Sequence, residues 1–272
     1  MTKVGIISGG GPLPLIIGKN LINKKIDVCF FSIKNFCDNK QFNNYENIEI
    51  ELSSFSSILD SLRNKNINQI VMVGKIKRPS IKDISFDYMT INLIKNFFLE
   101  SKGDDQLLKT ISEFFTKKGF PLFDWKNYCT DLFSSKDHLS INLPSKKAIN
   151  NMKKGSKIFK IIGKADIGQS LIVQNELILG VECIEGTDEL IKRCNNLKKD
   201  GDKGILLKLS KYSQHTNLDV PTIGLETLKK LKYFNYEGIF IEKNNCVILE
   251  KTKMINFCNE NSLFLSTINK IE

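Results

Sequence analysis

The chain has 272 residues, long enough for two domains, and its hydrophobic fraction of 41% with 26% charged residues is ordinary for a globular protein. No apolar run approaches the ~20 residues that a membrane-spanning helix needs. The net charge of +10 is spread along the chain without basic blocks interleaved with aromatic residues. We therefore expect no nucleic acid as a partner, which leaves a solvated surface, an anionic membrane surface or a phosphorylated substrate.

The first predicted strand, residues 3–8, runs into three glycines and then a predicted helix over residues 12–24. Glycines let the backbone approach a phosphate, and the N–H groups at a helix start carry partial positive charge. Gly9 and Gly11 match two glycines of a dinucleotide fingerprint, but Pro14 stands where the third is expected. The loop therefore predicts a nucleotide other than NAD, or a tight turn without a ligand.

The rest of the N-terminal half alternates apolar strands with amphipathic helices. We predict strands over residues 27–33 and 70–73, and helices over 54–65 and 104–118. The strands show no polar alternation, which is typical of a parallel sheet covered by helices on both faces. The strand at 27–33 also lacks the terminal acidic residue that would hold a ribose. The fold class is thus α/β, with a Rossmann-like, doubly wound domain over residues 1–130 and an irregular linker over 131–145.

The C-terminal half, residues 146–272, has a different pattern of helices and strands and predicts a mixed α/β domain. The expected helices cover residues 145–162, a segment after Gly186, residues 222–233, and a segment near the end. The expected strands form one hairpin over 171–173 and 177–183, a single strand over 204–209, a second hairpin over 238–241 and 246–249, and a last strand over 264–266. We expect Thr222 to cap the helix that follows it.

Several classes of protein are disfavoured by what the sequence lacks. Its seven cysteines are scattered and form no Cys-x-x-Cys, which indicates reduced thiols in a cytoplasm and no zinc site. A glycine loop interrupts the first apolar segment, so we expect no signal peptide. The two histidines, His138 and His215, occur without a hydrolase, zincin or P-loop motif. We expect His138 to be structural, whereas His215 shares a loop with Asp219.

Polar groups that could carry chemistry lie beside glycines and prolines. Lys75 belongs to a basic loop, residues 74–79, that follows a predicted strand, and Asp104 and Asp105 begin a predicted helix. Segments 166–169 and 185–188 bracket the first predicted hairpin. A basic surface loop and helix capping are the structural alternatives for these groups.

Asp219 precedes Val220 and Pro221 in a rigid turn. A carboxylate held in such a turn can bind a divalent ion or position a water molecule. The alternative is an ordinary turn aspartate.

Six motifs, taken in order, resemble one family over nearly the whole chain. They are Gly-Ile-Ile-Ser-Gly-Gly-Gly-Pro-Leu-Pro (5–14), Val-Gly-Lys-Ile-Lys-Arg-Pro (73–79), Lys-Gly-Asp-Asp-Gln-Leu-Leu (102–108), Ala-Asp-Ile-Gly-Gln-Ser (165–170), Val-Glu-Cys-Ile-Glu-Gly-Thr-Asp (181–188) and Asp-Val-Pro-Thr-Ile-Gly (219–224). The family they resemble is that of the LpxI-type UDP-2,3-diacylglucosamine pyrophosphatases of lipid A biosynthesis.

The resemblance implies a hydrolase in which water attacks the α-phosphorus of UDP-2,3-diacylglucosamine. The implied products are UMP and 2,3-diacylglucosamine 1-phosphate, and the implied cofactor is a divalent cation, Mg²⁺. An N-terminal Rossmann-like domain and a C-terminal α/β domain are expected to enclose the ligand. The alternative is a protein of the same architecture that binds or senses a nucleotide sugar without catalysis.

The resemblance also assigns residues. Asp219 is the expected catalytic carboxylate and, with Asp166, the expected metal ligand. The expected substrate contacts are Gly10, Gly11, Lys75, Asp104, Asp105, Gln169, Glu185, Thr187 and Asp188. A lipid substrate implies a cytoplasmic protein at the inner membrane, held weakly on its anionic surface, and a homodimer is left open.

Overall fold

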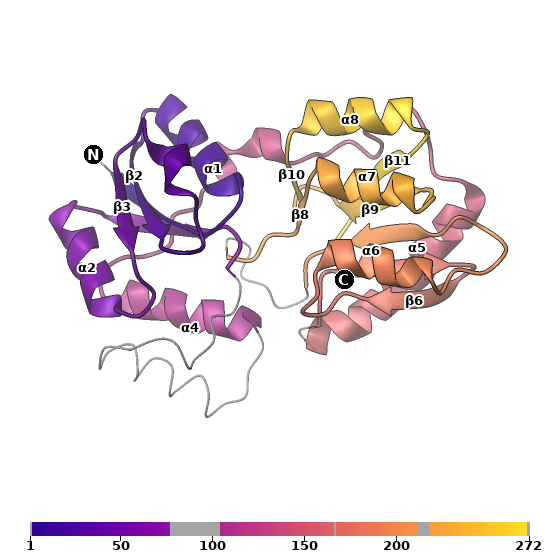
Figure 1. Ribbon diagram of the computed structural model, residues 1–272, viewed down its shortest axis with the longest axis horizontal. Coiled ribbons are helices and arrows are strands. Elements are labelled where there is room, and N and C mark those ends of the chain that lie inside the picture. The colour runs from indigo at the N-terminus through magenta and orange to yellow at the C-terminus, as the bar shows by residue number, and fades with distance from the viewer. Residues whose placement is uncertain (1, 77–103, 166, 212–217, 271–272) are drawn as a thin grey trace. The chain divides into compact units, whose positions relative to one another are not determined.

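The computed structural model describes residues 2–76, 104–165, 167–211 and 218–270 (Figure 1). The chain divides into two compact units. The first contains residues 1–129 together with residues 217–219, and the second contains residues 130–216 and 220–272. Across the described residues, no helix combines the length and apolarity that a bilayer-spanning segment requires.

The first unit is built on a four-stranded sheet in which every pairing is parallel. The strand order is β3-β2-β1-β4. Its strands are β1 (Lys3–Ser8), β2 (Asp27–Ile33), β3 (Asn47–Ile50) and β4 (Gln69–Val73). The predicted parallel sheet and its strands over 3–8, 27–33 and 70–73 are confirmed, whereas β3 at the sheet edge was not predicted.

Helices cover both faces of this sheet (Figure 1). They are α1 (Leu13–Asn23), α2 (Phe55–Asn64) and α4 (Asp104–Lys117), close to the predicted ranges. Gly18 of α1 lies against Phe30 and Ile6 on one face. The other face buries Phe31 and its neighbours against α2 and α4. Alternate residues of each strand therefore face different helices, which explains the continuous apolar runs.

The second unit contains a five-stranded mixed sheet with the order β11-β9-β7-β5-β6. The strands are β5 (Ser170–Gln174), β6 (Leu177–Val181), β7 (Ile205–Lys208), β9 (Gly238–Glu242) and β11 (Phe264–Ile268). β7, β9 and β11 are parallel, whereas β5 is antiparallel to both of its neighbours. The predicted mixed α/β organisation and the first hairpin are confirmed.

Helices pack on both faces of this sheet (Figure 1). Helix α5 (Lys146–Ile162) packs on Leu171 and Val173, whereas Ile172 faces the opposite group. That group consists of α6 (Thr187–Asn195), α7 (Leu225–Tyr233) and α8 (Lys251–Glu260). The period of two along β5 thus separates two apolar layers.

The predicted second hairpin is wrong. β9 pairs with β7 and β11 in the large sheet, whereas β10 (Val247–Ile248) pairs in parallel with β8 (Thr222–Ile223) in a separate two-stranded sheet. The predicted cap is also wrong, because α7 begins at Leu225 after Gly224, and the Thr222 hydroxyl donates to the carbonyl of Val220 instead.

The segment before α5 runs beside the edge strand β11. The amide of Leu139 donates to the carbonyl of Leu265, the amide of Thr267 donates to the carbonyl of Asp137, and His138 Nδ1 lies 2.9 Å from the Ser266 hydroxyl. His138 is therefore a partner of the sheet edge. The seven cysteines are all free thiols, and Cys183 is the exposed one.

Candidate functional site

In the first unit, two glycine loops cross at the carboxyl ends of β1 and β4. The amide of Gly9 donates to Val73, and Gly10 and Lys75 exchange two backbone hydrogen bonds of 2.8 Å. A Cβ on Gly9 would stand 2.8 Å from the Gly74 carbonyl carbon, and one on Gly74 would stand 2.7 Å from the same atom of Gly9. Close backbone packing therefore explains Gly9 and Gly74 without a ligand.

Gly11, unlike Gly9 and Gly74, does not pack closely against another part of the backbone. Its φ is +92°, a backbone conformation that favours glycine, and a Cβ there would meet no atom within 4 Å. Because Pro12 and Pro14 have no N–H, the start of α1 offers fewer donors than an ordinary helix terminus. The donors available to an anion at this loop are therefore the backbone N–H groups around Gly11.

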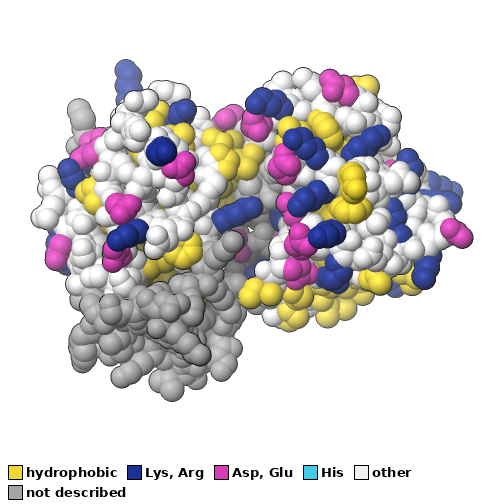
Figure 2. Space-filling model, viewed as in Figure 1, with side chains coloured by type: hydrophobic (Ala, Val, Ile, Leu, Met, Phe, Trp, Pro, Cys, Tyr) yellow, Lys and Arg dark blue, Asp and Glu magenta, His cyan; other side chains and the backbone are white. Residues whose placement is uncertain are grey.

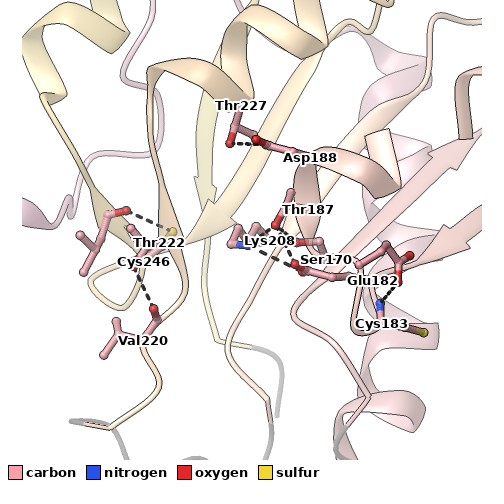
Figure 3. Close-up of polar contacts among 12 residues, drawn as sticks. Ser170, Glu182, Cys183, Thr187, Asp188, Lys208, Val220, Thr222, Thr227 and Cys246 are labelled. Carbon is pink, nitrogen blue, oxygen red and sulfur yellow. Dashed lines mark hydrogen bonds and ion pairs between the residues drawn. The ribbon is translucent and has the colours of Figure 1, made fainter. Parts of the chain in front are cut away.

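In the second unit, polar side chains converge where β7 ends and α6 begins (Figure 3). Ser170 and Lys208 are register partners on antiparallel strands, so their side chains project from the same face of the sheet. Lys208 Nζ donates to Thr187 Oγ1 at 2.5 Å and to Ser170 Oγ at 3.3 Å. Thr187 in turn donates to Glu182 Oε1 at 2.8 Å. We call these four residues the Lys208 cluster.

Burial strengthens the attraction between the charged groups of the Lys208 cluster. Only 7% of the Lys208 side chain and 12% of the Glu182 side chain are exposed, and Lys208 Nζ lies 3.7 Å from Glu182 Oε2. That distance allows an ion pair but is beyond a normal hydrogen bond. Glu182 Oε2 is buried and accepts no hydrogen bond from any described residue. A buried carboxylate oxygen that accepts no hydrogen bond within the protein can accept one from a bound molecule.

The Lys208 ammonium also lies at the first turn of α6, because its partner Thr187 is the first residue of that helix. The N-terminal end of a helix carries partial positive charge from unpaired N–H groups. An ammonium and a helix N-terminus placed together favour a bound anion such as phosphate.

Two predicted contacts near the Lys208 cluster are engaged elsewhere. Asp188 forms an ion pair of 3.0 Å with Lys230 and accepts a hydrogen bond from Thr227, which ties α6 to α7. Glu185 accepts from Arg193 at 2.6 Å and from the amide of Cys183. Burial opposes the effect, but the Arg193 hydrogen bond holds the pKa of Glu185 below its ordinary value. Both carboxylates therefore stabilise the surroundings of α6.

The turn that contains Asp219 is anchored on its C-terminal side. Asp219 is half-buried in a bend, and Val220 and Pro221 lead directly into β8. The carbonyl of Pro221 accepts from the amide of Val247, and that of Val220 accepts from Thr222. The parallel pairing of β8 with β10 therefore fixes the backbone that follows the carboxylate.

The other predicted residues are placed as follows. Gln169 is half-buried, and its carbonyl accepts from the amide of Leu209. The Lys75 side chain is exposed, and Asp104 and Asp105 begin α4 with side chains outside the described part of the chain. Asp166, His215 and the end of the basic loop, residues 77–79, also lie outside the described residues.

Comparison with known proteins identifies the family. Residues 3–132 match the model of the LpxI N-terminal domain, and residues 135–266 match that of the LpxI C-terminal domain. The chain belongs to the LpxI family. A relative from Caulobacter vibrioides, named UDP-2,3-diacylglucosamine pyrophosphatase LpxI, is 25% identical in an alignment that covers 97% of each chain.

The LpxI fold brings together residues that sequence reasoning missed. Ser170 and Glu182 lie inside two of the motifs, but Lys208 lies in none of them. The signal that could have found Lys208 is its place at the end of a buried apolar strand, where a charge requires a partner. Thr187 is the predicted residue that the structure joins to this set.

The donor set for a metal in this LpxI chain is small. Among the described residues, no three or more His, Cys, Asp or Glu side chains are grouped so that they could share an ion. Mg²⁺ in proteins often takes only one or two carboxylates, with water and substrate phosphate as its other ligands. An oxygen donor such as Asp219, in a turn fixed by β8, fits a metal of this kind.

Proposed function

We propose that this chain hydrolyses UDP-2,3-diacylglucosamine to UMP and 2,3-diacylglucosamine 1-phosphate in lipid A biosynthesis. The substrate comes from the name of the Caulobacter relative, and both LpxI domain models support the assignment. The observation that carries the proposal is the Lys208 cluster, which places a buried ammonium at a helix N-terminus. A diphosphate is the anion that suits it. The same proposal places the protein in the cytoplasm at the inner membrane.

The first unit is, in this proposal, a Rossmann-like domain that binds the nucleotide. The strand order β3-β2-β1-β4 and the glycine loop between β1 and α1 support this role, since such sheets bind ligands at the carboxyl ends of their strands. The proposed contacts in this unit are Gly10, Gly11, Lys75, Asp104 and Asp105. The amide of Gly10 already donates to Lys75, so Gly11 is the more accessible backbone donor.

The proposed reaction forms a bond between a water oxygen and the α-phosphorus. The bond from the α-phosphorus to the bridging oxygen breaks, and that oxygen leaves with the β-phosphate. Lys208 stabilises the negative charge that develops on the phosphate oxygens, while Ser170 and Thr187 hold its ammonium in place. Asp219 orients the water and accepts its proton. Glu182 Oε2 accepts a hydrogen bond from a hydroxyl of the sugar.

Metal dependence is part of the proposal, with Asp219 and Asp166 as the carboxylates that hold Mg²⁺. When bound, the cation offsets the charge of the diphosphate and lowers the pKa of a coordinated water. Gln169, Glu185 and Asp188 complete the proposed surroundings of the substrate, the last two by fixing the start of α6.

The test is UMP release from UDP-2,3-diacylglucosamine in the presence of Mg²⁺, measured for the purified protein and for Asp219→Ala. We expect the wild type to release UMP and the variant to bind substrate without hydrolysing it. Asp137→Ala, an exposed aspartate paired with Lys243, is the matched control and keeps full activity. Substrate binding without UMP release at every Mg²⁺ concentration would instead identify a nucleotide-sugar sensor.

A further inference from the structure

Helix α5 presents a solvent face on which every charge is positive. Its sequence contains six lysines and no acidic residue, and all six lysines are exposed. Four of them share the face opposite the buried Ala148, Gly155 and Phe159, because their spacing of seven, four and three residues follows the helical period. These four are Lys146, Lys153, Lys157 and Lys160, and we call them the lysine stripe. None of the four forms an ion pair with a described residue.

The opposite face of the same unit carries charges of both signs. On α6, α7 and α8, Lys192 pairs with Glu189, Lys229 with Glu226 and Lys253 with Glu250. Figure 2 shows Lys and Arg interspersed with Asp and Glu over these three helices. The unpaired positive charge of the lysine stripe is therefore a property of α5, and the lysine-rich composition alone does not account for it.

Three isoleucines are exposed near the C-terminal end of α5. The exposed fraction is 67% for Ile161, 40% for Ile167 and 84% for Ile184. We call them the apolar rim. They belong to one edge of the unit, because the amide of Ile167 donates to the carbonyl of Ile162 and the next residue, Gly168, packs against the carbonyl of Glu182. In Figure 2, apolar side chains gather along the edge where β6 and an end of α5 lie.

We propose that the lysine stripe and the apolar rim form the surface with which this protein docks on an anionic lipid bilayer. This inference rests on the proposed function, since a diacylated substrate is held in a membrane. Lysines on an amphipathic helix are attracted to anionic headgroups, and neighbouring apolar side chains enter the interface. The rim adjoins Glu182, so docking places the Lys208 cluster at the headgroup level.

The test for the lysine stripe is sedimentation with vesicles of phosphatidylethanolamine and phosphatidylglycerol. The variant Lys153→Gln, Lys157→Gln, Lys160→Gln keeps helix-forming residues on α5 and removes three charges. We expect it to lose about 100-fold in partitioning, which corresponds to about 1 kcal/mol for each lysine. The matched control, Lys192→Gln, Lys229→Gln, Lys253→Gln, removes the same charge from the opposite face and keeps most of the binding.

The apolar rim is tested by Ile184→Ser, in an exposed position where the fold tolerates a polar side chain. We expect a loss of about tenfold in partitioning that added salt does not change, because it reflects apolar burial. The control is Ile141→Ser, since Ile141 is 77% exposed beside α8 at the other edge of the sheet. It keeps wild-type binding.

Several outcomes would overturn the docking surface. One is an equal loss of vesicle partitioning in the two triple lysine variants. Another is binding to phosphatidylcholine vesicles that is as strong as binding to the anionic vesicles. The third is unchanged vesicle binding by Ile184→Ser. UMP release in detergent micelles separates this inference from the proposed function. Activity in micelles without vesicle binding contradicts the docking surface alone, whereas binding through α5 without any UMP release contradicts the proposed function alone.

Discussion

At the carboxyl ends of β1 and β4, the first unit is held by backbone hydrogen bonds between glycine loops. At the carboxyl end of β7, the second unit is held by side chains, with Lys208 between Ser170, Thr187 and Glu182. The first arrangement requires the absence of side chains, and the second requires a particular set of them. Backbone packing alone can thus explain a glycine motif, whereas buried charged side chains must be explained by the partners that balance their charges.

The largest effect on stability is expected at the crossing of the glycine loops. Gly74 and Gly119 both have positive φ, +105° and +93°, but a Cβ on Gly119 meets no atom within 4 Å. Gly119→Ala should cost only the backbone strain, about 1–2 kcal/mol. Gly74→Ala adds a clash with the backbone of Gly9 and should cost roughly 4 kcal/mol. Urea unfolding measures both, and equal costs would show that the crossing contributes nothing.

A smaller loss of stability is expected from the hydroxyl at the centre of the Lys208 cluster. Thr187→Val removes the acceptor for Lys208 and the donor for Glu182, and leaves both buried groups short of a partner. We expect a loss of about 2 kcal/mol in the free energy of unfolding. Thr227→Val is the matched control, because its hydroxyl bonds to Asp188, which keeps Lys230. If Thr227→Val lost as much free energy of unfolding as Thr187→Val, the Thr187 hydroxyl would contribute no more to stability than another hydrogen-bonded hydroxyl of this unit.

The smallest effect is expected for the exposed ion pairs of the first unit. Hydrogen bonds from Lys3 and Lys65 lower the pKa of Glu46. A lowered carboxylate pKa stabilises the fold fully above the unfolded-state pKa, and this contribution is lost as the pH falls through the folded-state pKa. Glu46→Gln should therefore cost less than about 1 kcal/mol at neutral pH, and nothing in acid. A cost that persists in acid would require a different explanation.

The sequence predicted the elements whose patterns are local. Strands β1, β2 and β4 are continuous apolar runs, and α4 and α5 have a clear helical period, so each was placed within two residues. The edge strand β3 was missed because it has four residues and Ile50 is the buried one. Asn244 and Asn245 form a turn, but a turn does not determine which strand the following residues pair with.

The candidate site was predictable only in part, for the same reason. Thr187 begins α6 directly after a recognisable glycine turn, and the motif around it was found. Lys208 becomes informative only when the antiparallel register sets it beside Ser170 and α6 brings Thr187 to the same place. Asp188 and Glu185 have the residue type of site residues, yet their partners Lys230 and Arg193 lie on α7 and α6, which the motifs do not indicate.

The account depends most directly on the ammonium of Lys208, so the decisive measurement is the kcat of Lys208→Met for UMP release. Lys198→Met is the matched control, since Lys198 is a partly buried lysine of the same unit that donates to the carbonyls of Phe234 and Asn235. With circular dichroism showing that both variants are folded, we expect kcat to fall at least about 100-fold for Lys208→Met and to stay unchanged for the control. A folded Lys208→Met variant with wild-type kcat would contradict the assignment of the Lys208 cluster as the site of hydrolysis.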